Sequence, residues 1–308
     1  MKMKTPTFYF GLLHPRYWLT WFSLGLMALI AQLPYSGQIF LGKILGQGAY
    51  YIARSRRHIA RRNIELCFPE KSHHEREQLV KEHFITNGIT LFEMGMAWFM
   101  PYARLQKLFV VKGKEHWDTL KAEGKGALII GLHFNTLEIA NVPVSSLFDL
   151  HTSYRAHNNP VFDLVQHRRR QRNNPKSEAI NRYDMRGMIR VLKRGDWLWY
   201  APDQDYGRKV SEFVPWFGIP AATLAATPRL LKIAKVPVVG LSYRRLPEYK
   251  GYEIEFKPAL EGLPSGDDYQ DLVQLNQYIE CCVRDNPVEY LWVHRRFKTR
   301  PEGQPKLY

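Results

Sequence analysis

Short apolar runs alternate with amphipathic segments over most of the chain, and this alternation most restricts its possible folds. Five apolar runs predict strands: ALIIGL (127–132), LHTSY (150–154), WLWYA (197–201), VPVVGLSY (236–243) and YEIEF (252–256). Segments with helical spacing lie between them, at 161–172, 184–193, 224–234 and 269–285. Strands separated by helices are typical of α/β domains. We therefore predict an α/β fold with a mostly parallel central sheet flanked by helices.

Residues 36–105 are predicted to be helical, and no Pro/Gly/Ser-rich linker separates them from the α/β core at 106–308. Ser72 and Glu75 form a capping box that opens a helix reaching about Phe99, with Gly88 as a possible weak point. The amphipathic segment 39–52 runs into a cluster of arginines. It either lies on anionic lipid or packs as a core helix with a solvated end.

The segment from Tyr17 to Leu33 carries no charged residue. At 1.5 Å per residue it is about 25 Å long, near the lower limit for spanning a bilayer, so it either spans or lies in one leaflet. No small-x-small cleavage site follows Ala31. Arginines are more frequent after the segment than before it, which places the main body on the cytoplasmic side. We predict that residues 1–35 are a membrane anchor.

The charge of the chain indicates the kind of partner it meets. Its 44 Lys and Arg against 29 Asp and Glu give a net charge of +15. This excess of positive charge favours an anionic partner. The partner is nucleic acid, an anionic membrane surface or an acidic protein, and charge alone does not choose among the three. The three cysteines have no C-x-x-C spacing, so they indicate reduced thiols rather than disulfides or a zinc site.

His133 stands where the strand predicted at 127–132 ends. Ligands of open α/β sheets bind at the carboxyl ends of strands. Glu138 falls in the first turn of the following helix, from which it can fold back toward the imidazole and orient it as a general base. The His-x4-Glu spacing alone is a weak signal, because a histidine at a strand end is often only hydrogen-bonded.

Other polar residues also follow the predicted elements. Asp203 and Asp205 come after the strand 197–201, where they either meet His133 or form a turn. The arginines at 168–172 lie on a predicted helix, so one or two face inward. H-E-x-x-H, G-x-S-x-G and phosphate-loop motifs are missing from the sequence. The metal-like HHERE at 73–77 belongs to the capping turn, and we predict no metal site.

Several sequence blocks together resemble a known family. They are HPRYWLTW (14–21), RRNIELCFPE (61–70), GLHFNTLE (131–138), NNPVFD (158–163), APDQDYG (201–207), FVPWFG (213–218) and HRRFKTRPEG (294–303). His-x4-Glu is similar to the motif of the lysophospholipid-type acyltransferase superfamily. The full set resembles the late acyltransferases of bacterial lipid A biosynthesis, most of all their lauroyl branch, from end to end of the chain.

The resemblance implies a function and its partners. The donor is an acyl carrier protein thioester, a co-substrate rather than a cofactor, and the acceptor is a hydroxyacyl chain of the Kdo-bearing lipid IVA precursor. His133 and Glu138 are the implied catalytic pair, and Arg170 and Asp203 the implied substrate-binding residues. No nucleophilic Ser or Cys is evident, so direct transfer is expected. The implied location is the inner membrane, on its anionic lipids, with the catalytic domain on the cytoplasmic side.

Two other functions fit part of the sequence. One is an acyl-CoA-dependent glycerophospholipid acyltransferase, which usually carries an F-P-E-G-T-R block that is not found here. The other is a membrane-tethered nucleic-acid-binding protein that uses the basic segments, although no known nucleic-acid module is visible. Sequence does not choose between lauroyl, palmitoleoyl and myristoyl donors, because these enzymes share the motif.

Overall fold

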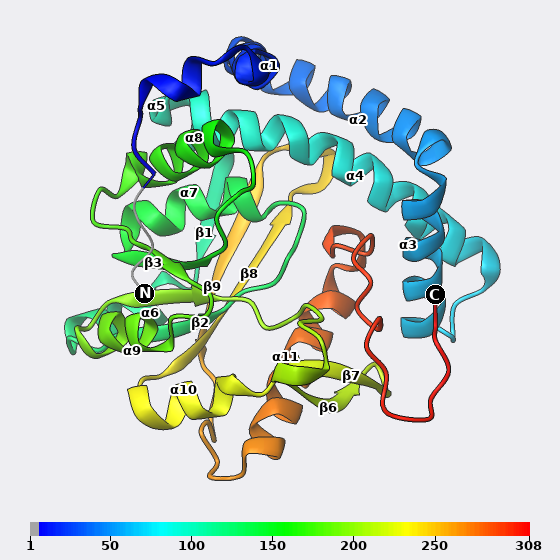
Figure 1. The fold of residues 1–308 in the computed structure, drawn as a ribbon, viewed down its shortest axis with the longest axis vertical. Coiled ribbons are helices and arrows are strands. Elements are labelled where there is room, and N and C mark those ends of the chain that lie inside the picture. Colours follow the sequence, from blue (N-terminus) through cyan, green and yellow to red (C-terminus); the bar gives the residue numbers. More distant parts are fainter. Residues whose placement is uncertain (1–5) are drawn as a thin grey trace.

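The computed structural model describes residues 6–308, and a seven-stranded sheet forms its centre (Figure 1). The strand order is β1-β9-β8-β2-β5-β3-β4. A separate hairpin consists of β6 and β7. The strands are β1 Phe109–Lys112, β2 Ala127–Ile130, β3 Leu150–Tyr154, β4 Ala179–Asn181, β5 Trp197–Tyr200, β6 Ser211–Trp216, β7 Ile219–Leu224, β8 Val238–Arg245 and β9 Tyr252–Ala259.

The sheet is mostly parallel, which confirms the predicted fold class. Five neighbouring pairs are parallel, and only β8 and β9 run antiparallel. The exception follows from the short connection 246–251, because a few residues cannot carry the chain back for a parallel crossover. Two edge strands, β1 and β4, were not predicted. They have four and three residues, which is too short to show a clear pattern.

Helices cover the sheet and form a layer above it (Figure 1). The four helices predicted within the α/β core are confirmed, as α8, α9, α10 and α11. The helices are α1 Trp18–Ile30, α2 Tyr35–Ile52, α3 Arg54–Cys67, α4 His73–Phe99, α5 Tyr102–Leu105, α6 Lys114–Ala122, α7 Leu137–Leu147, α8 Pro160–Arg170, α9 Met185–Lys193, α10 Ala226–Ala234 and α11 Asp268–Asp285. The predicted capping box opens α4, since Glu75 N donates to Ser72 Oγ and Ser72 N donates to Glu75 Oε2.

Three glycines allow α2 and α4 to cross at close range. A Cβ added to Gly88 would lie 2.3 Å from both the Gly42 carbonyl oxygen and the Gly46 amide nitrogen. These are backbone atoms, which cannot move aside without shifting a helix. Gly88 is therefore where the two helices touch.

A Gly88→Ala variant should lose about 3 kcal/mol of unfolding free energy, because the added methyl group overpacks the crossing. The matched control is Gly37→Ala in α2, where a Cβ meets nothing within 4 Å. Alanine should leave stability unchanged there or raise it by up to about 1 kcal/mol, through its helix propensity. Urea denaturation of both variants measures the difference. Equal stability of the two would contradict the crossing.

The apolar N-terminal segment is broken into parts. The helix α1 ends at Ile30 and α2 begins at Tyr35, so the predicted segment 17–33 is not one continuous helix. The α1 helix has 13 residues, which is about 20 Å. Within residues 6–308, no helix is both long enough and apolar enough to cross a membrane. The prediction of a spanning or leaflet-embedded anchor is thus left without a spanning helix.

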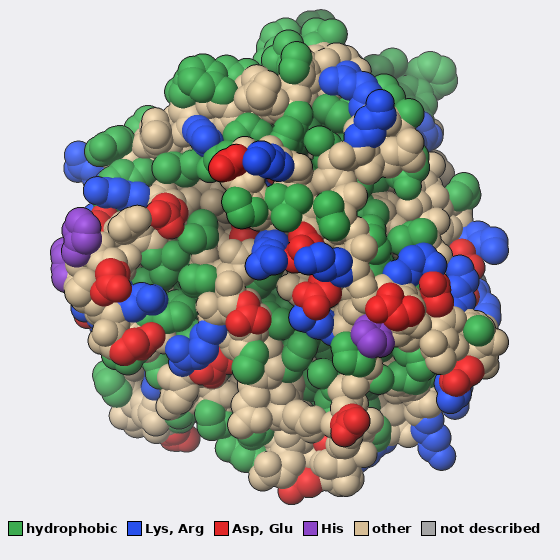
Figure 2. Space-filling model, turned by 180° about the vertical axis from the view of Figure 1, so that it is seen from behind, with side chains coloured by type: hydrophobic (Ala, Val, Ile, Leu, Met, Phe, Trp, Pro, Cys, Tyr) green, Lys and Arg blue, Asp and Glu red, His purple; other side chains and the backbone are tan. Residues whose placement is uncertain are grey.

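Large hydrophobic side chains on α1 and α2 face outward, and we call this surface the apolar ridge. Figure 2 shows hydrophobic side chains along the upper part of the molecule, the end at which α1 and α2 lie in Figure 1. Each member of the ridge is at least 52% exposed: Trp18, Leu19, Phe22 and Leu29 on α1, and Phe40, Ile44, Tyr51 and Ile52 on α2. Eight large exposed hydrophobic side chains on two consecutive helices are more than the single scattered apolar residues of an ordinary protein surface, and they indicate an interaction surface.

Candidate active site

His133 lies in the loop that follows β2, at the carboxyl end of the parallel strands. The strand β2 is fully buried between β5 and β8. The Leu132 carbonyl accepts a hydrogen bond from the Tyr243 hydroxyl, and the His133 carbonyl accepts one from Leu291 N at 3.0 Å. The predicted place of His133 is therefore confirmed, and its backbone is fixed on both sides.

Asp203 is the hydrogen-bond partner of His133. Its Oδ1 lies 2.6 Å from His133 Nδ1, and its Oδ2 accepts from the His133 backbone N–H at 2.9 Å. The Asp203 side chain is completely buried, whereas 27% of the His133 side chain is exposed. An ionised carboxylate only accepts hydrogen bonds, so in the neutral imidazole Nδ1 carries the proton and Nε2 has a free lone pair.

The pair also shifts the pKa of each partner. Burial by itself lowers the pKa of His133, but the charge of Asp203 and its hydrogen bond outweigh burial, so the pKa is raised. Burial would raise the pKa of the Asp203 carboxyl, yet the charge and hydrogen bonds of His133 hold it below its usual value. The arrangement therefore stabilises an imidazolium beside a carboxylate, as a general base requires.

The expected contact between Glu138 and His133 is not made, which corrects the sequence prediction. Glu138 lies in the first turn of α7, as expected. Its carboxylate instead accepts hydrogen bonds from Arg170, with Nε at 3.0 Å and Nη2 at 2.6 Å, and from Trp98 Nε1 at 2.6 Å. These donors reach it from α8 and α4. These three donors hold the Glu138 carboxylate in place, and the His133 ring is hydrogen-bonded to Asp203 instead.

Arg170 and Arg172 are the inward-facing members of the arginine cluster at 168–172, and Arg170 is the one that pairs with Glu138. Its charge outweighs the effect of burial on Glu138 and holds the pKa of that carboxyl below its usual value. The neighbouring Arg168 and Arg169 are exposed. Arg172 donates to the carbonyls of Trp98 and Met100 at 2.9 Å and so caps the C-terminal end of α4. The resemblance therefore selected the one arginine that pairs with Glu138.

The two aspartates after β5 have different places. Asp203 was expected to bind substrate, but both of its oxygens are bonded to His133. Asp205 does not meet His133. It accepts hydrogen bonds from Thr299 N at 2.7 Å and Oγ1 at 2.8 Å, and from Gly207 N at 2.9 Å. Asp205 thus links the loop after β5 to the C-terminal segment. Its bond to Gly207 N forms a turn, which is one of the two predicted alternatives.

The C-terminal segment holds the site together, and the sequence analysis missed it. The Tyr290 hydroxyl donates to the Asp203 carbonyl at 3.1 Å, and Tyr290 pairs with Phe134 as an isolated bridge. His294 Nε2 accepts from Asp205 N at 3.3 Å. Burial lowers the pKa of His294 to about 4, so this imidazole is neutral near pH 7. The HRRFKTRPEG block at 294–303 marked this segment in the sequence, but no role was predicted for its residues.

A buried ion cluster supports the other side of the His133 loop. Arg245, at the end of β8, donates to both oxygens of Glu93 at 2.6 Å and to Glu289 Oε1 at 2.7 Å. Glu289 lies in a 3₁₀ turn, η7 (Pro287–Glu289), and its carbonyl accepts from Asn135 N at 2.7 Å. The cluster therefore joins α4, the sheet and the loop that follows His133.

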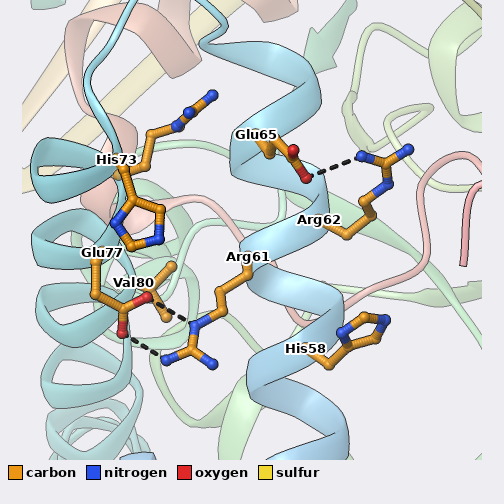
Figure 3. A pocket seen from close by; sticks show the side chains of 8 residues that line it. His58, Arg61, Arg62, Glu65, His73, Glu77 and Val80 are labelled. Atoms are coloured by element: carbon orange, nitrogen blue, oxygen red, sulfur yellow. Dashed lines mark hydrogen bonds and ion pairs between the residues drawn. The ribbon is translucent and has the colours of Figure 1, made fainter.

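A polar hollow lies between α3 and α4 (Figure 3). Two of its arginines are already neutralised. Arg61 pairs with Glu77 at 2.7 Å, and Arg62 pairs with Glu65 at 2.8 Å. None of its lining residues belongs to the His133 site. The HHERE motif borders this hollow, and across residues 6–308 no group of three His, Cys, Asp or Glu is arranged to hold a metal.

The comparison with known proteins decides the family. Residues 5–299 match the family described as bacterial lipid A biosynthesis acyltransferase. The chain belongs to this family. It is therefore an O-acyltransferase by descent, and the resemblance found in the sequence blocks is confirmed.

Relatives in this acyltransferase family carry names for different acyl chains. The chain is 41% identical to the lipid A biosynthesis palmitoleoyltransferase of Escherichia coli over 96% of both chains. It is also 41% identical to the lauroyltransferase of the same organism, over 98% of this chain and 99% of the relative. The E. coli myristoyltransferase is 31% identical, over 96% and 91%. The two equal identities do not favour the lauroyl branch over the palmitoleoyl branch, so they do not decide the expected lauroyl preference.

Proposed function

We propose that the chain transfers a fatty acyl group from an acyl carrier protein thioester to a hydroxyacyl chain of the Kdo-bearing lipid IVA precursor, with His133 as general base. The observation that carries the proposal is the hydrogen bond between His133 Nδ1 and Asp203 at the carboxyl edge of the sheet. It leaves Nε2 free on the more exposed partner. Membership of the lipid A acyltransferase family supports the lipid acceptor.

The chemistry follows from this pair. The acceptor hydroxyl gives its proton to His133 Nε2 as its oxygen attacks the thioester carbonyl carbon. The negative charge moves to the carbonyl oxygen in a tetrahedral intermediate. When the intermediate collapses, the C–S bond breaks, and the imidazolium returns its proton to the departing thiolate. Asp203 stabilises the imidazolium between the two proton transfers. Because the acceptor oxygen attacks the thioester directly, no acyl-enzyme is required.

Glu138 and Arg170 have a different role in the proposal. Glu138 holds the guanidinium by two hydrogen bonds, which fixes the direction of its remaining N–H donors. We assign Arg170 to the binding of a substrate anion or oxyanion, and Glu138 to the positioning of Arg170. Loss of Glu138 should therefore impair transfer through Arg170 rather than through the His133 ring.

The acidic carrier protein is proposed to dock on α3. Arg54 and Arg56 are exposed there, and no described carboxylate pairs with either. The helix also adjoins the site, because Asn63 Nδ2 donates to the Trp292 and His294 carbonyls at 2.7 Å. A cationic helix beside the reaction centre suits an acidic donor protein.

Reversing both α3 charges, Arg54→Glu with Arg56→Glu, should raise the KM for an acyl carrier protein thioester roughly tenfold at low salt. The KM for a CoA thioester should change far less, because the small donor needs no protein surface. The control reverses two exposed arginines of α9, Arg186 and Arg190. Steady-state kinetics with both donors make the comparison. Equal effects of the two double variants on the KM for the carrier thioester would contradict the proposed docking surface on α3.

The apolar ridge is proposed to enter one leaflet of the anionic inner membrane, with the catalytic body on the cytoplasmic side. Burial of exposed apolar side chains in the acyl boundary drives such binding. The variant Trp18→Ser/Leu19→Ser/Phe22→Ser should bind vesicles at least about tenfold more weakly. The control replaces exposed Val210, Tyr183 and Tyr269 with Ser. Flotation with vesicles of anionic phospholipid measures both, and equal binding would rule the ridge out.

The transfer reaction itself is tested by product mass. The purified chain is incubated with the precursor and with carrier proteins bearing lauroyl, palmitoleoyl or myristoyl groups. We expect a product that is heavier by one acyl group, with lauroyl preferred. Acylation of a lysoglycerophospholipid in place of the precursor would support the rival acyltransferase. No acylated product from any of these acceptors would overturn the proposal.

A further inference from the structure

An apolar groove runs between α1 and α8. Its volume is about 500 Å³, which lies within the range of roughly 300–1,000 Å³ found for ligand sites. The α1 wall is a stripe at helical spacing, which consists of Trp21, Leu24, Gly25 and Ala28. The opposite wall is formed by Leu164 and Val165 of α8, with Phe8 and Phe99 at the sides.

The two walls are fixed relative to each other. Asn159, the N-cap of α8, donates from Nδ2 to Thr20 Oγ1 on α1 at 2.8 Å. Gly25 faces the open space, since a Cβ added there meets nothing within 4 Å. The same helix carries the exposed ridge residues Phe22 and Leu29. A chain leaving a lipid leaflet can therefore pass from the ridge into the groove.

Arg168 and Arg169 line the groove at the surface of the molecule. Neither guanidinium pairs with a carboxylate within residues 6–308, and α1 contains no acidic residue. Arg169 stacks over the Phe99 ring, with 4.7 Å between its Cζ and the ring centroid. Burial and the nearby charge of Arg169 together lower the pKa of Arg172. This rim is thus cationic and lacks its counter-ion.

The groove also adjoins the reaction centre. Arg169 lines a second, smaller hollow together with Trp98, Glu138 and Arg170. Glu138 and Arg170 are the ion pair of the site, and Glu138 lies on the helix that follows the His133 loop. A ligand in the groove is therefore held next to the residues that we assign to transfer.

We propose that this groove binds one acyl chain of the phosphorylated acceptor lipid, with Arg168 and Arg169 against its phosphate. The proposal rests on the proposed function and names where the acceptor lies. Apolar walls suit a hydrocarbon chain, and two unpaired guanidinium groups suit a phosphate. A donor thioester has no charge beside its chain, so the cationic rim favours the acceptor over the donor.

The test fills the groove without disturbing the fold. Gly25→Leu places a bulky side chain in the open space, Ala28→Leu enlarges a side chain that lines the groove, and leucine favours a helix. The matched control is Gly48→Leu in α2, where a Cβ also meets nothing within 4 Å. Each variant is assayed for equilibrium binding of the radiolabelled Kdo-bearing lipid IVA precursor in non-ionic detergent, and for transfer kinetics.

We expect Gly25→Leu and Ala28→Leu to raise the precursor Kd and KM roughly tenfold, since the chain loses the burial of several methylene groups. The donor KM should stay within about twofold of wild type, and Gly48→Leu should change nothing. Arg168→Gln with Arg169→Gln should weaken binding of the precursor, but not of a dephosphorylated precursor.

The groove assignment is overturned if wild type does not bind the precursor, or if the precursor Kd is unchanged in both leucine variants. A shift to shorter donor chains with the precursor Kd unchanged would in addition give the groove to the donor. Binding without any transfer by wild type would defeat the proposed function instead, and the Kd values would still decide the groove.

Discussion

The His133→Ala variant should transfer acyl groups roughly a thousandfold more slowly than wild type, because a positioned general base typically contributes 10²- to 10⁴-fold. An alcohol does not ionise at neutral pH, so its proton needs an acceptor at the moment of attack. His133 Nε2 is that acceptor in our proposal. Single-turnover rates, followed by product mass with a carrier thioester and the lipid IVA precursor, measure the loss directly.

The loss must be separated from misfolding. Alanine removes the ring partner of the buried Asp203 carboxylate, so the unfolding midpoint should fall, and rates are measured at a temperature at which circular dichroism shows the variant folded. The control is His116→Ala, an exposed histidine on α6, outside both the His133 site and the α3 docking surface. It should retain activity. A folded His133→Ala variant that works within about tenfold of wild type would contradict the role of His133 as base.

The Asp203→Asn variant should also lose roughly a thousandfold in kcat, for a different reason. An asparagine amide donates a hydrogen bond to Nδ1, which moves the imidazole proton to Nε2. The nitrogen that faces the substrate is then no longer a base. Asp203→Asn keeps the shape of the side chain, so the fold and the precursor Kd should change little. Single-turnover rates and equilibrium precursor binding together check this prediction.

Glu138→Gln is the informative comparison for Asp203→Asn. It removes the ion pair with Arg170 and leaves the His133–Asp203 hydrogen bond in place. We expect a smaller loss of kcat than in Asp203→Asn, with a higher substrate KM. A larger loss in Glu138→Gln than in Asp203→Asn would return Glu138 to the role of orienting His133.

Local sequence patterns predicted much of this architecture. The uninterrupted apolar run at 127–132 marks a central strand, and His133 follows it because parallel strands end at a common edge. The capping box at Ser72 correctly begins α4. Helical spacing gave α8, but it could not tell which arginine faces inward, since neighbouring positions differ by about 100°.

Contacts between distant segments escaped the sequence analysis. Glu138 is five residues from His133, yet Arg170 and Trp98 hold its carboxylate, and Asp203 takes the histidine from 70 residues away. Such partners depend on the strand order, which places β2 beside β5. Similarly, the local sequence shows Gly88 only as a weak point of a helix. The close crossing with α2 explains why a glycine stands at position 88.

The pH dependence of kcat/KM tests the central claim most directly, namely that His133 is the base and Asp203 sets its pKa. Neutral His133 is the active form, so activity falls as the pH drops through its raised pKa. Removing the charge of Asp203 leaves burial, which lowers this pKa. The acid limb should therefore move to lower pH in Asp203→Asn and stay in place in Glu138→Gln. An acid limb that stays in place in Asp203→Asn, or moves only in Glu138→Gln, would contradict the account.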